Sequence, residues 1–164
     1  FKPMRELRSL IMDKNPLVEL DEWAFDGIYQ SLYNISLQNT KLKSLSCLKH
    51  FEKLERAKLN YNEIQTLDFN LLSKSSRTLS NLDLQNNQID QIEFINLINM
   101  ESLSDLDLSN NKLCTFNGQL LKHNILPKLR NLGLSQNPLV CDCYLLPLYE
   151  WSRLKFDKEM FNYI

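Results

Sequence analysis

The sequence predicts an α/β solenoid, in which short repeats stack side by side with a parallel β-sheet on one face and irregular segments with short helical turns on the other. Two observations predict this fold. The chain has 164 residues, of which 33 are Leu and 18 are Asn but only 3 are Gly. A fixed spacing of apolar residues and Asn also recurs six times, and its successive starts lie 25, 22, 25, 24 and 26 residues apart.

The recurring spacing is Leu-x-x-Leu-x-Leu-x-x-Asn-x-Leu, with Ile, Met or Ala at a few of the Leu positions. The Leu-x-Leu step has the two-residue period of a β-strand, so both side chains point to one face. One short strand per repeat cannot pair with itself, so it pairs in parallel with the strands of neighbouring repeats. The six segments begin at Leu7, Leu32, Leu54, Leu79, Leu103 and Leu129.

The Asn of each segment follows the predicted strand, where the chain turns. A buried Asn side chain at a turn hydrogen-bonds backbone groups that would otherwise lack partners. We therefore expect a ladder of Asn side chains along the stack, in which Thr40 is the one departure. The ladder positions are Asn15, Thr40, Asn62, Asn87, Asn111 and Asn137.

The second half of each repeat carries further apolar residues, for example Phe25, Phe51 and Phe69. Because their spacing varies between repeats, we expect loops, turns and short helical pieces on this side rather than uniform long helices. We expect the Leu and Phe side chains of both halves to form the core.

Composition and motifs exclude several classes of function. The net charge of −1 gives no electrostatic reason to expect nucleic acid or an anionic membrane as a partner. No apolar run approaches the roughly 20 residues of a membrane span, and the opening Phe-Lys-Pro-Met-Arg is not a signal peptide. The sequence contains no Gly-x-Gly-x-x-Gly, P-loop, His-Glu-x-x-His or Gly-x-Ser-x-Gly motif. We therefore expect neither enzyme activity nor a cofactor.

With this repeat, the chain resembles the leucine-rich-repeat family over residues 1–140, and the extracellular, irregular-backed subtype fits best. The offsets of Leu20, Phe25 and Gly27 are similar to those of that subtype. The resemblance implies a right-handed, curved solenoid with the parallel sheet on its concave side. Residues 1–6 then correspond to the tail of an absent earlier repeat, because Phe1 precedes Leu7 much as Phe25 precedes the second repeat.

The segment after the sixth repeat resembles the cysteine-rich C-terminal cap of Toll-type receptors and Slit-type proteins. It contains Asn137-Pro138-Leu139, Cys141, Cys143 and a predicted helical face of Leu145, Leu148, Trp151 and Leu154, with Pro147 near the helix start. In such proteins the cap covers the hydrophobic end of the stack, and two further downstream cysteines pair with the Cys-x-Cys pair. This sequence ends at Ile164 before either appears. The resemblance thus implies a partial capping region over residues 141–164 and a chain that is a piece of a longer extracellular protein.

The other two cysteines, Cys47 and Cys114, lie three strand spacings apart, about 14 Å, beyond the roughly 7 Å over which a disulfide closes. We expect both to act as small apolar residues, buried or half-buried. A pairing of Cys114 with the cap pair stays open. Zinc binding by Cys141 and Cys143 is not expected, because it needs two more ligands and the two His of the chain occur at unrelated positions.

Function in a solenoid depends on its surface columns, which alternate strand residues form on the concave face. The candidate ligand-binding residues there are a basic spot (Arg56 and Lys58), an acidic spot (Asp83, Asp105 and Asp107) and one aromatic residue, Tyr61. The two spots are predicted to lie one to two strands apart, roughly 5–10 Å. Like charges at this spacing repel, which favours a binding site for a partner of complementary charge. The alternative is that this is an ordinary solvated face without a binding role, on which Arg56 and Lys58 simply offset the charge of Asp83.

The chain contains one N-glycosylation sequon, Asn34-Ile35-Ser36, in a concave-facing column. A glycan on Asn34 would block that part of the sheet and shift binding to the later repeats or to a flank. The alternative is a chance match in an Asn-rich sequence.

The resemblance implies an extracellular recognition module from a receptor ectodomain of the Toll-like kind, which binds a protein ligand or co-receptor in innate immunity or cell guidance and acts in signal transduction. A secreted adhesion or matrix protein that uses the solenoid as a spacer is the alternative. A cytosolic scaffold is disfavoured, because a Cys-x-Cys cap needs oxidation to close. Membrane attachment is expected only through a segment that this sequence lacks, and homo- or heterodimer formation is left open.

Overall fold

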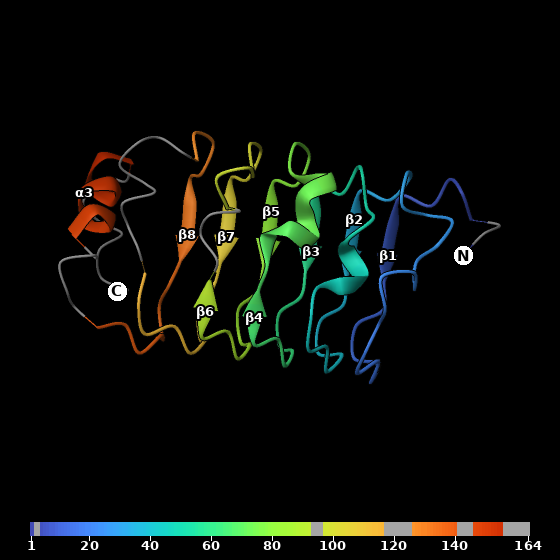
Figure 1. Cartoon of the computed structure of the whole chain (residues 1–164), viewed down its shortest axis with the longest axis horizontal. Coiled ribbons are helices and arrows are strands. Elements are labelled where there is room, and N and C mark those ends of the chain that lie inside the picture. Colours follow the sequence, from blue (N-terminus) through green and yellow to red (C-terminus); the bar gives the residue numbers. More distant parts are fainter. Residues whose placement is uncertain (2–3, 93–96, 117–125, 141–145, 156–164) are drawn as a thin grey trace.

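The computed structural model describes residues 1, 4–92, 97–116, 126–140 and 146–155. Six short strands form one parallel sheet in the order β1-β2-β3-β5-β7-β8, which runs along the stack (Figure 1). Each strand begins two residues after the first Leu of its repeat, so the prediction of one strand per repeat is confirmed. The strands are β1 (Ser9–Ile11), β2 (Asn34–Ser36), β3 (Arg56–Lys58), β5 (Asn81–Asp83), β7 (Asp105–Asp107) and β8 (Asn131–Gly133).

The opposite side of the solenoid contains short, irregular elements, as predicted. They are the 3-10 helices η1 (Ser46–Leu48) and η2 (Phe69–Ser75) and the strands β4 (Thr66–Leu67) and β6 (Gln91–Ile92). The strands β4 and β6 pair in parallel as a second, two-stranded sheet, which the sequence did not predict. Asp68 immediately precedes η2 as its N-cap, and its carboxylate accepts the Asn70 N–H at 2.8 Å, which satisfies a donor at the helix start.

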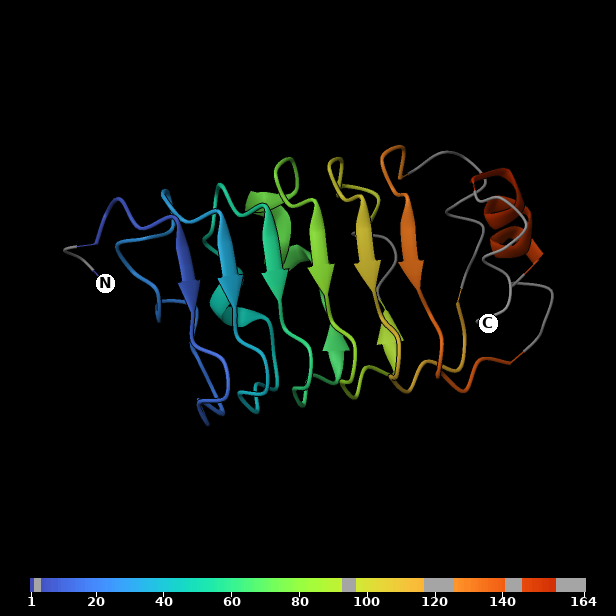
Figure 2. The same ribbon diagram turned by 180° about the vertical axis from the view of Figure 1, so that it is seen from behind.

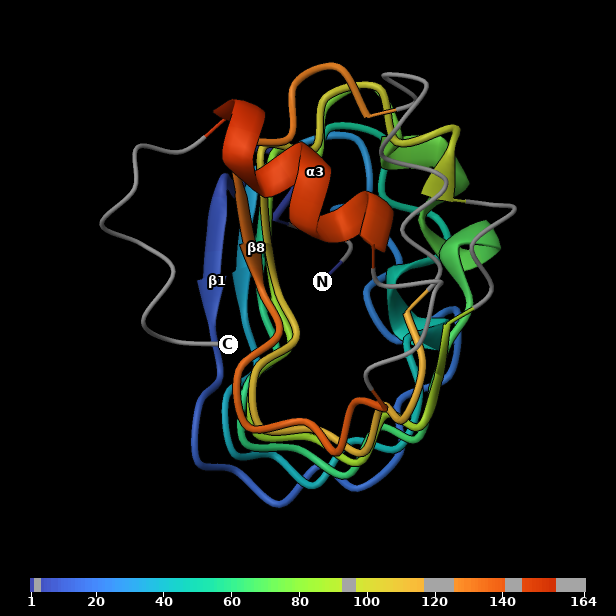
Figure 3. The same cartoon turned by 90° about the vertical axis from the view of Figure 1, so that its left-hand side faces the viewer.

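The helix α3 (Leu146–Lys155) lies across the C-terminal end of the stack (Figure 3). Pro147 occupies its first turn, where the missing N–H group has no helical partner to lose. Leu148 is buried against the core. The predicted helix is therefore confirmed, whereas Cys141 and Cys143 lie outside the described residues.

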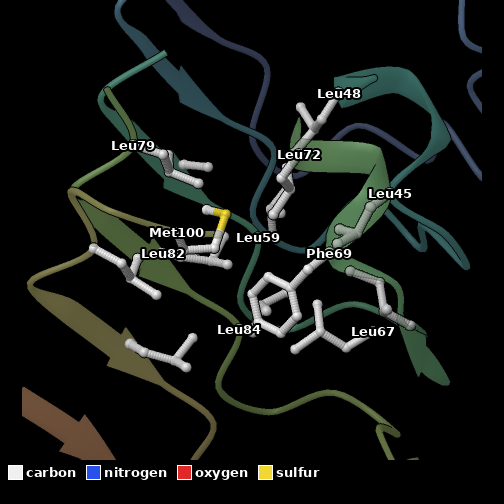
Figure 4. Close-up of a cluster of buried hydrophobic side chains, with 14 of the residues drawn as sticks. Leu45, Leu48, Leu59, Leu67, Phe69, Leu72, Leu79, Leu82, Leu84 and Met100 are labelled. Carbon is white, nitrogen blue, oxygen red and sulfur yellow. The ribbon is translucent and has the colours of Figure 1, made fainter. Parts of the chain in front are cut away.

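Apolar side chains from the two sides of the solenoid meet in one continuous core (Figure 4). The buried side chains in this view come from the sheet side (Leu59, Leu82 and Leu84) and from the outer side (Leu45, Leu48, Phe69 and Leu72). Nearer the N-terminus, the Phe51 ring lies 5.7 Å from the Phe25 ring and 5.3 Å from the Tyr29 ring. Full burial of one such side chain contributes about 1.5–3 kcal/mol. The outer half of each repeat is therefore held by the same core as the strands.

The predicted Asn ladder is present from Asn62 to Asn137, where it joins consecutive repeats. At its N-terminal end the prediction does not hold, because Asn15 is exposed and its amide donates to the Met12 and Asp13 carbonyls of its own repeat. Asn62 donates to the carbonyl oxygens of Leu37 and Leu59 at 2.7 and 2.9 Å. Its Oδ1 atom accepts the N–H groups of Thr40 and Leu42 at 2.9 and 3.0 Å. The same kind of bonds to the preceding repeat is made by Asn87, Asn111 and Asn137. The ladder thus satisfies buried backbone groups at the described turns between these repeats.

The residue before each ladder position adopts a φ between 54° and 60°, in the left-handed region that favours Gly and Asn. We call these residues the turn row: Lys14, Asn39, Tyr61, Asn86, Asn110 and Gln136. In the first five, the backbone N–H donates to a carbonyl of the following repeat at 2.8–3.1 Å. The stack therefore imposes the turn on residues other than Gly, which explains how a fold with so many turns contains so few Gly.

The two described cysteines differ from each other in burial. Cys47 is fully buried, as predicted, and burial raises the pKa of its thiol to about 12, so it stays protonated. Cys114 is exposed, and the expectation that it is buried or half-buried is wrong. It directly follows the buried Leu113 and precedes the exposed Thr115.

Candidate protein-binding face

The strand register brings the predicted charged residues onto one face of the sheet. The first column runs Arg56, Asn81, Asp105, and the second runs Lys58, Asp83, Asp107. Adjacent strands lie about 4.8 Å apart, so the basic spot adjoins the acidic spot. Figure 2 shows the sheet from this side, with none of the described helices in front of it. The face is therefore open to a partner over the described part of the chain.

Hydrogen bonds fix the carboxylates of the acidic spot. Asp107 Oδ1 accepts the Ser109 N–H at 2.9 Å, and Asp83 Oδ1 accepts the Gln85 N–H at 3.2 Å. Asp105 accepts bonds from the Asn131 side chain and the Ser104 hydroxyl. All three Asp residues are half-buried. These carboxylates are held in place before any partner binds, which lowers the entropy that binding has to remove.

Asp83 lies at the boundary of the two spots. Partial burial raises the pKa of Asp83 above its ordinary value, and the neighbouring Asp107 carboxylate raises it further. The Gln85 hydrogen bonds and the Lys58 charge oppose this shift. Among the described residues, no ion pair joins Arg56 or Lys58 to the acidic spot. The positive charge of Lys58 thus compensates the Asp83 carboxylate only in part. A cation from a binding partner would therefore still be attracted to this carboxylate.

We predict that Asp83→Asn stabilises the protein at neutral pH. Because the pKa of Asp83 is raised on folding, the folded state binds more protons than the unfolded state, and the free energy of unfolding falls as pH rises through that pKa. The Asn side chain does not titrate, and its amide oxygen can still accept the hydrogen bond from the Gln85 N–H. The gain is on the order of 0.5 kcal/mol, because the group is only half-buried.

Urea denaturation between pH 4 and pH 8 measures this effect. Asp90→Asn, which makes the same change of charge at an exposed position of the same repeat, is the control, and we expect it to change the unfolding free energy at pH 7 by less than the Asp83 variant does. A lower unfolding free energy for the Asp83 variant at pH 7 would contradict the prediction.

Gly133 also shapes this face, although it was not among the predicted site residues. A Cβ atom at Gly133 would lie 2.3 Å from Asp107 Oδ1 and 2.8 Å from Ser109 Oγ. The absent side chain thus gives the Asp107 carboxylate room to extend toward β8. The signal in the sequence is the single Gly in a column whose other members carry side chains.

Asn34 and Tyr61 flank the charged spots. Asn34 is half-buried between Ser9 and Arg56, and its Oδ1 atom is buried without a hydrogen-bond partner among the described residues. Tyr61 is 57% exposed, a short distance along the chain after β3. The sheet therefore brings all six candidate ligand-binding residues and the sequon onto or beside one surface.

A second polar cluster, which the sequence did not indicate, lies on the outer side of the first three repeats. The His50 ring stacks on Trp23 at 4.3 Å and lies 3.3 Å from Glu22 Oε2 and 3.4 Å from Lys74 Nζ. Lys49 also binds Glu22 and holds the pKa of that carboxylate below its ordinary value. The cluster joins three repeats through charged and aromatic contacts.

The described residues show neither a metal centre nor a membrane span. No three His, Cys, Asp or Glu side chains among them are arranged to hold a metal ion. No described helix is long and apolar enough to cross a bilayer.

Comparison with known proteins finds related repeats. Residues 77–139 match the family model described as leucine rich repeat. The chain is 27% identical to trophoblast glycoprotein of Macaca fascicularis over 93% of its own length and 41% of that protein. It is 32% identical to Toll-like receptor 7 of Mus musculus over 87% of its own length and 14% of that receptor. The chain thus spans less than half the length of either relative.

Among solved structures, the chain is similar to the TLR13 chain of a TLR13–ssRNA13 complex. The TM-score is 0.67 with 22% identity, over 82% of this chain and 23% of that chain. At this identity the likeness concerns the fold alone. It agrees with the solenoid and its concave parallel sheet.

Proposed function

Because this chain is a leucine-rich-repeat protein, we propose that it is an extracellular recognition module from a receptor ectodomain, whose concave face binds a protein ligand or co-receptor. The observation that carries the proposal is the adjoining basic and acidic spots on an open sheet, with the carboxylates already held by hydrogen bonds. Preorganised charges of both signs favour one orientation of a partner over others. Roles in innate immunity or cell guidance, which the resemblance to Toll-type and Slit-type proteins implies, extend this proposal.

The charges of the face define the chemistry of the partner. It presents Lys or Arg side chains to the acidic spot and carboxylates to the basic spot. Nucleic acid fits this face poorly, because its phosphates would meet Asp105 and Asp107 and the chain has a net charge of −1. We therefore do not extend the RNA binding of the TLR13–ssRNA13 complex to this chain. We propose neither an enzyme activity nor a cofactor.

The extracellular location is part of the proposal. Relatives with receptor and glycoprotein names support it, as does the Cys-x-Cys pair, which requires oxidation to form its cap. We also propose that Asn34 carries a glycan, which would direct the partner to the later repeats. A change in electrophoretic mobility after N-glycosidase treatment of the secreted protein tests the glycan, and an unchanged mobility would refute it.

We expect the double substitution Asp105→Asn/Asp107→Asn to weaken binding of a basic probe peptide, (Arg-Ser)4, by about 5- to 30-fold at 0.15 M salt. Loss of two carboxylates removes charge-assisted hydrogen bonds to the guanidinium groups of the peptide. The expected loss of affinity is moderate, because the carboxylates are partly exposed and solvent screens their charge. Asn keeps the size of each side chain and can still accept the bonds from Ser109 and Asn131. Fluorescence anisotropy of the labelled peptide measures the dissociation constant.

The control is Glu19→Gln/Glu52→Gln, which changes the net charge equally at two exposed positions away from the sheet. We expect it to alter affinity less than 2-fold, as an effect of overall charge alone. Equal losses in both double variants would show that the peptide senses net charge rather than the acidic spot, and would leave the solenoid as a structural spacer.

A further inference from the structure

Tyr61 occupies a backbone position that disfavours it. Its φ is 59°, and its N–H donates to the Gln85 carbonyl at 3.1 Å, so the stacking of the repeats imposes the left-handed conformation. The turn-row residues on both sides, Asn39 and Asn86, are of the type that tolerates this conformation. An aromatic residue at this position therefore costs stability that Asn would not.

Among the described residues, the Tyr61 side chain has few specific contacts that would offset this cost. It is 57% exposed, and neither its ring nor its hydroxyl makes a ring contact or hydrogen bond with the described residues. The amide of Asn110, by contrast, donates to Asn86 along the same row. A strained backbone at a largely exposed side chain without hydrogen bonds or ring contacts to the described residues indicates a role outside the fold.

Tyr61 lies beside the boundary of the basic and acidic spots. Its N–H binds the Gln85 carbonyl, and the N–H of the same Gln85 binds Asp83 Oδ1. The Asp83 carboxylate is half-buried and has a raised pKa, so a nearby cation would stabilise its charged form. Gln85 thus links the turn that contains Tyr61 to the Asp83 carboxylate. A planar cation such as guanidinium is attracted to the face of an aromatic ring and pairs with a carboxylate.

The geometry points to Tyr61 as the aromatic anchor of the binding face, which holds the guanidinium group of a partner Arg against its ring while Asp83 supplies the opposite charge. This inference rests on the proposed function and specifies Arg as the partner side chain that the face recognises. In this view, the left-handed backbone at Tyr61 lowers the stability of the fold but places an aromatic ring where a partner binds.

The test compares stability and binding in the same variants. Tyr61→Asn should raise the thermal midpoint by about 2–4 °C, because Asn fits the left-handed turn. It should weaken binding of the (Arg-Ser)4 peptide by about 3- to 5-fold. Tyr61→Phe keeps the ring and should bind as wild type does. Asn39→Tyr, which places the ring in an equivalent turn away from the acidic spot, should lower the midpoint without raising affinity.

Wild-type affinity in the Tyr61→Asn variant, or an unchanged or lower midpoint, would overturn the inference. If Asp105→Asn/Asp107→Asn weakens binding while Tyr61→Asn does not, the anchor is refuted and the proposed binding face stands. If neither variant weakens binding, the proposed face itself fails.

Discussion

Replacement of Asn62 by Ala is expected to lower the free energy of unfolding by about 3–4 kcal/mol. The substitution removes bonds to two backbone carbonyls and two backbone N–H groups, and all four belong to buried residues. Each unsatisfied buried group costs about 1–3 kcal/mol, and some relaxation offsets the sum. Thermal unfolding should therefore show a midpoint lower by roughly 6–16 °C.

The matched control is Asn70→Ala, because Asn70 is an exposed Asn within η2 whose backbone, not its side chain, bonds to Asp68. We expect it to change stability by less than about 0.5 kcal/mol. If the two variants unfold at the same temperature, the Asn ladder does not hold the repeats together.

Replacement of Phe51 by Ala is expected to cost about 3–5 kcal/mol. The ring is fully buried and contacts the Phe25 and Tyr29 rings, so the substitution creates a cavity between the outer segments of the first two repeats. Phe51→Leu fills most of the space and should cost less than half as much.

Hydrogen exchange distinguishes a local effect from a global one for Phe51→Ala. Each repeat contacts mainly its neighbours, so the variant should exchange faster in β1 and β2 than in β7 and β8. Uniformly faster exchange along the sheet would show instead that the solenoid unfolds as a single unit.

Much of the fold could be predicted because it repeats. The Leu-x-Leu step fixed each strand and the polar columns on its far side, and the register confirms those columns. Asn62 and its equivalents could be assigned to a ladder, because a polar residue at a constant place in a stacked repeat needs a constant set of partners. The exposure of Cys114 could not be predicted, because the outer segments differ in length and no fixed spacing relates them.

The sequence predicted which columns of the sheet the candidate residues occupy, but it did not predict their electrostatic environment. The sequence placed Asp83 and Lys58 in one column, whereas the raised pKa of Asp83 depends on how deeply the column is buried and on Asp107 in the next repeat. The space above Gly133 and the left-handed backbone of Tyr61 likewise correspond to no motif in the sequence.

The sequence by itself determined the repeating unit, the direction and pairing of the strands, and the residues that face outward. These properties depend on period, and a period of two along a strand or about 24 along the chain can be read from residue types alone. Only the tertiary structure decided the strain at Tyr61, the second sheet of β4 and β6, and the cluster around His50. Each of these arises where side chains or backbone groups about 25 residues apart come into contact, and their energies depend on distances and burial that no spacing in the sequence encodes.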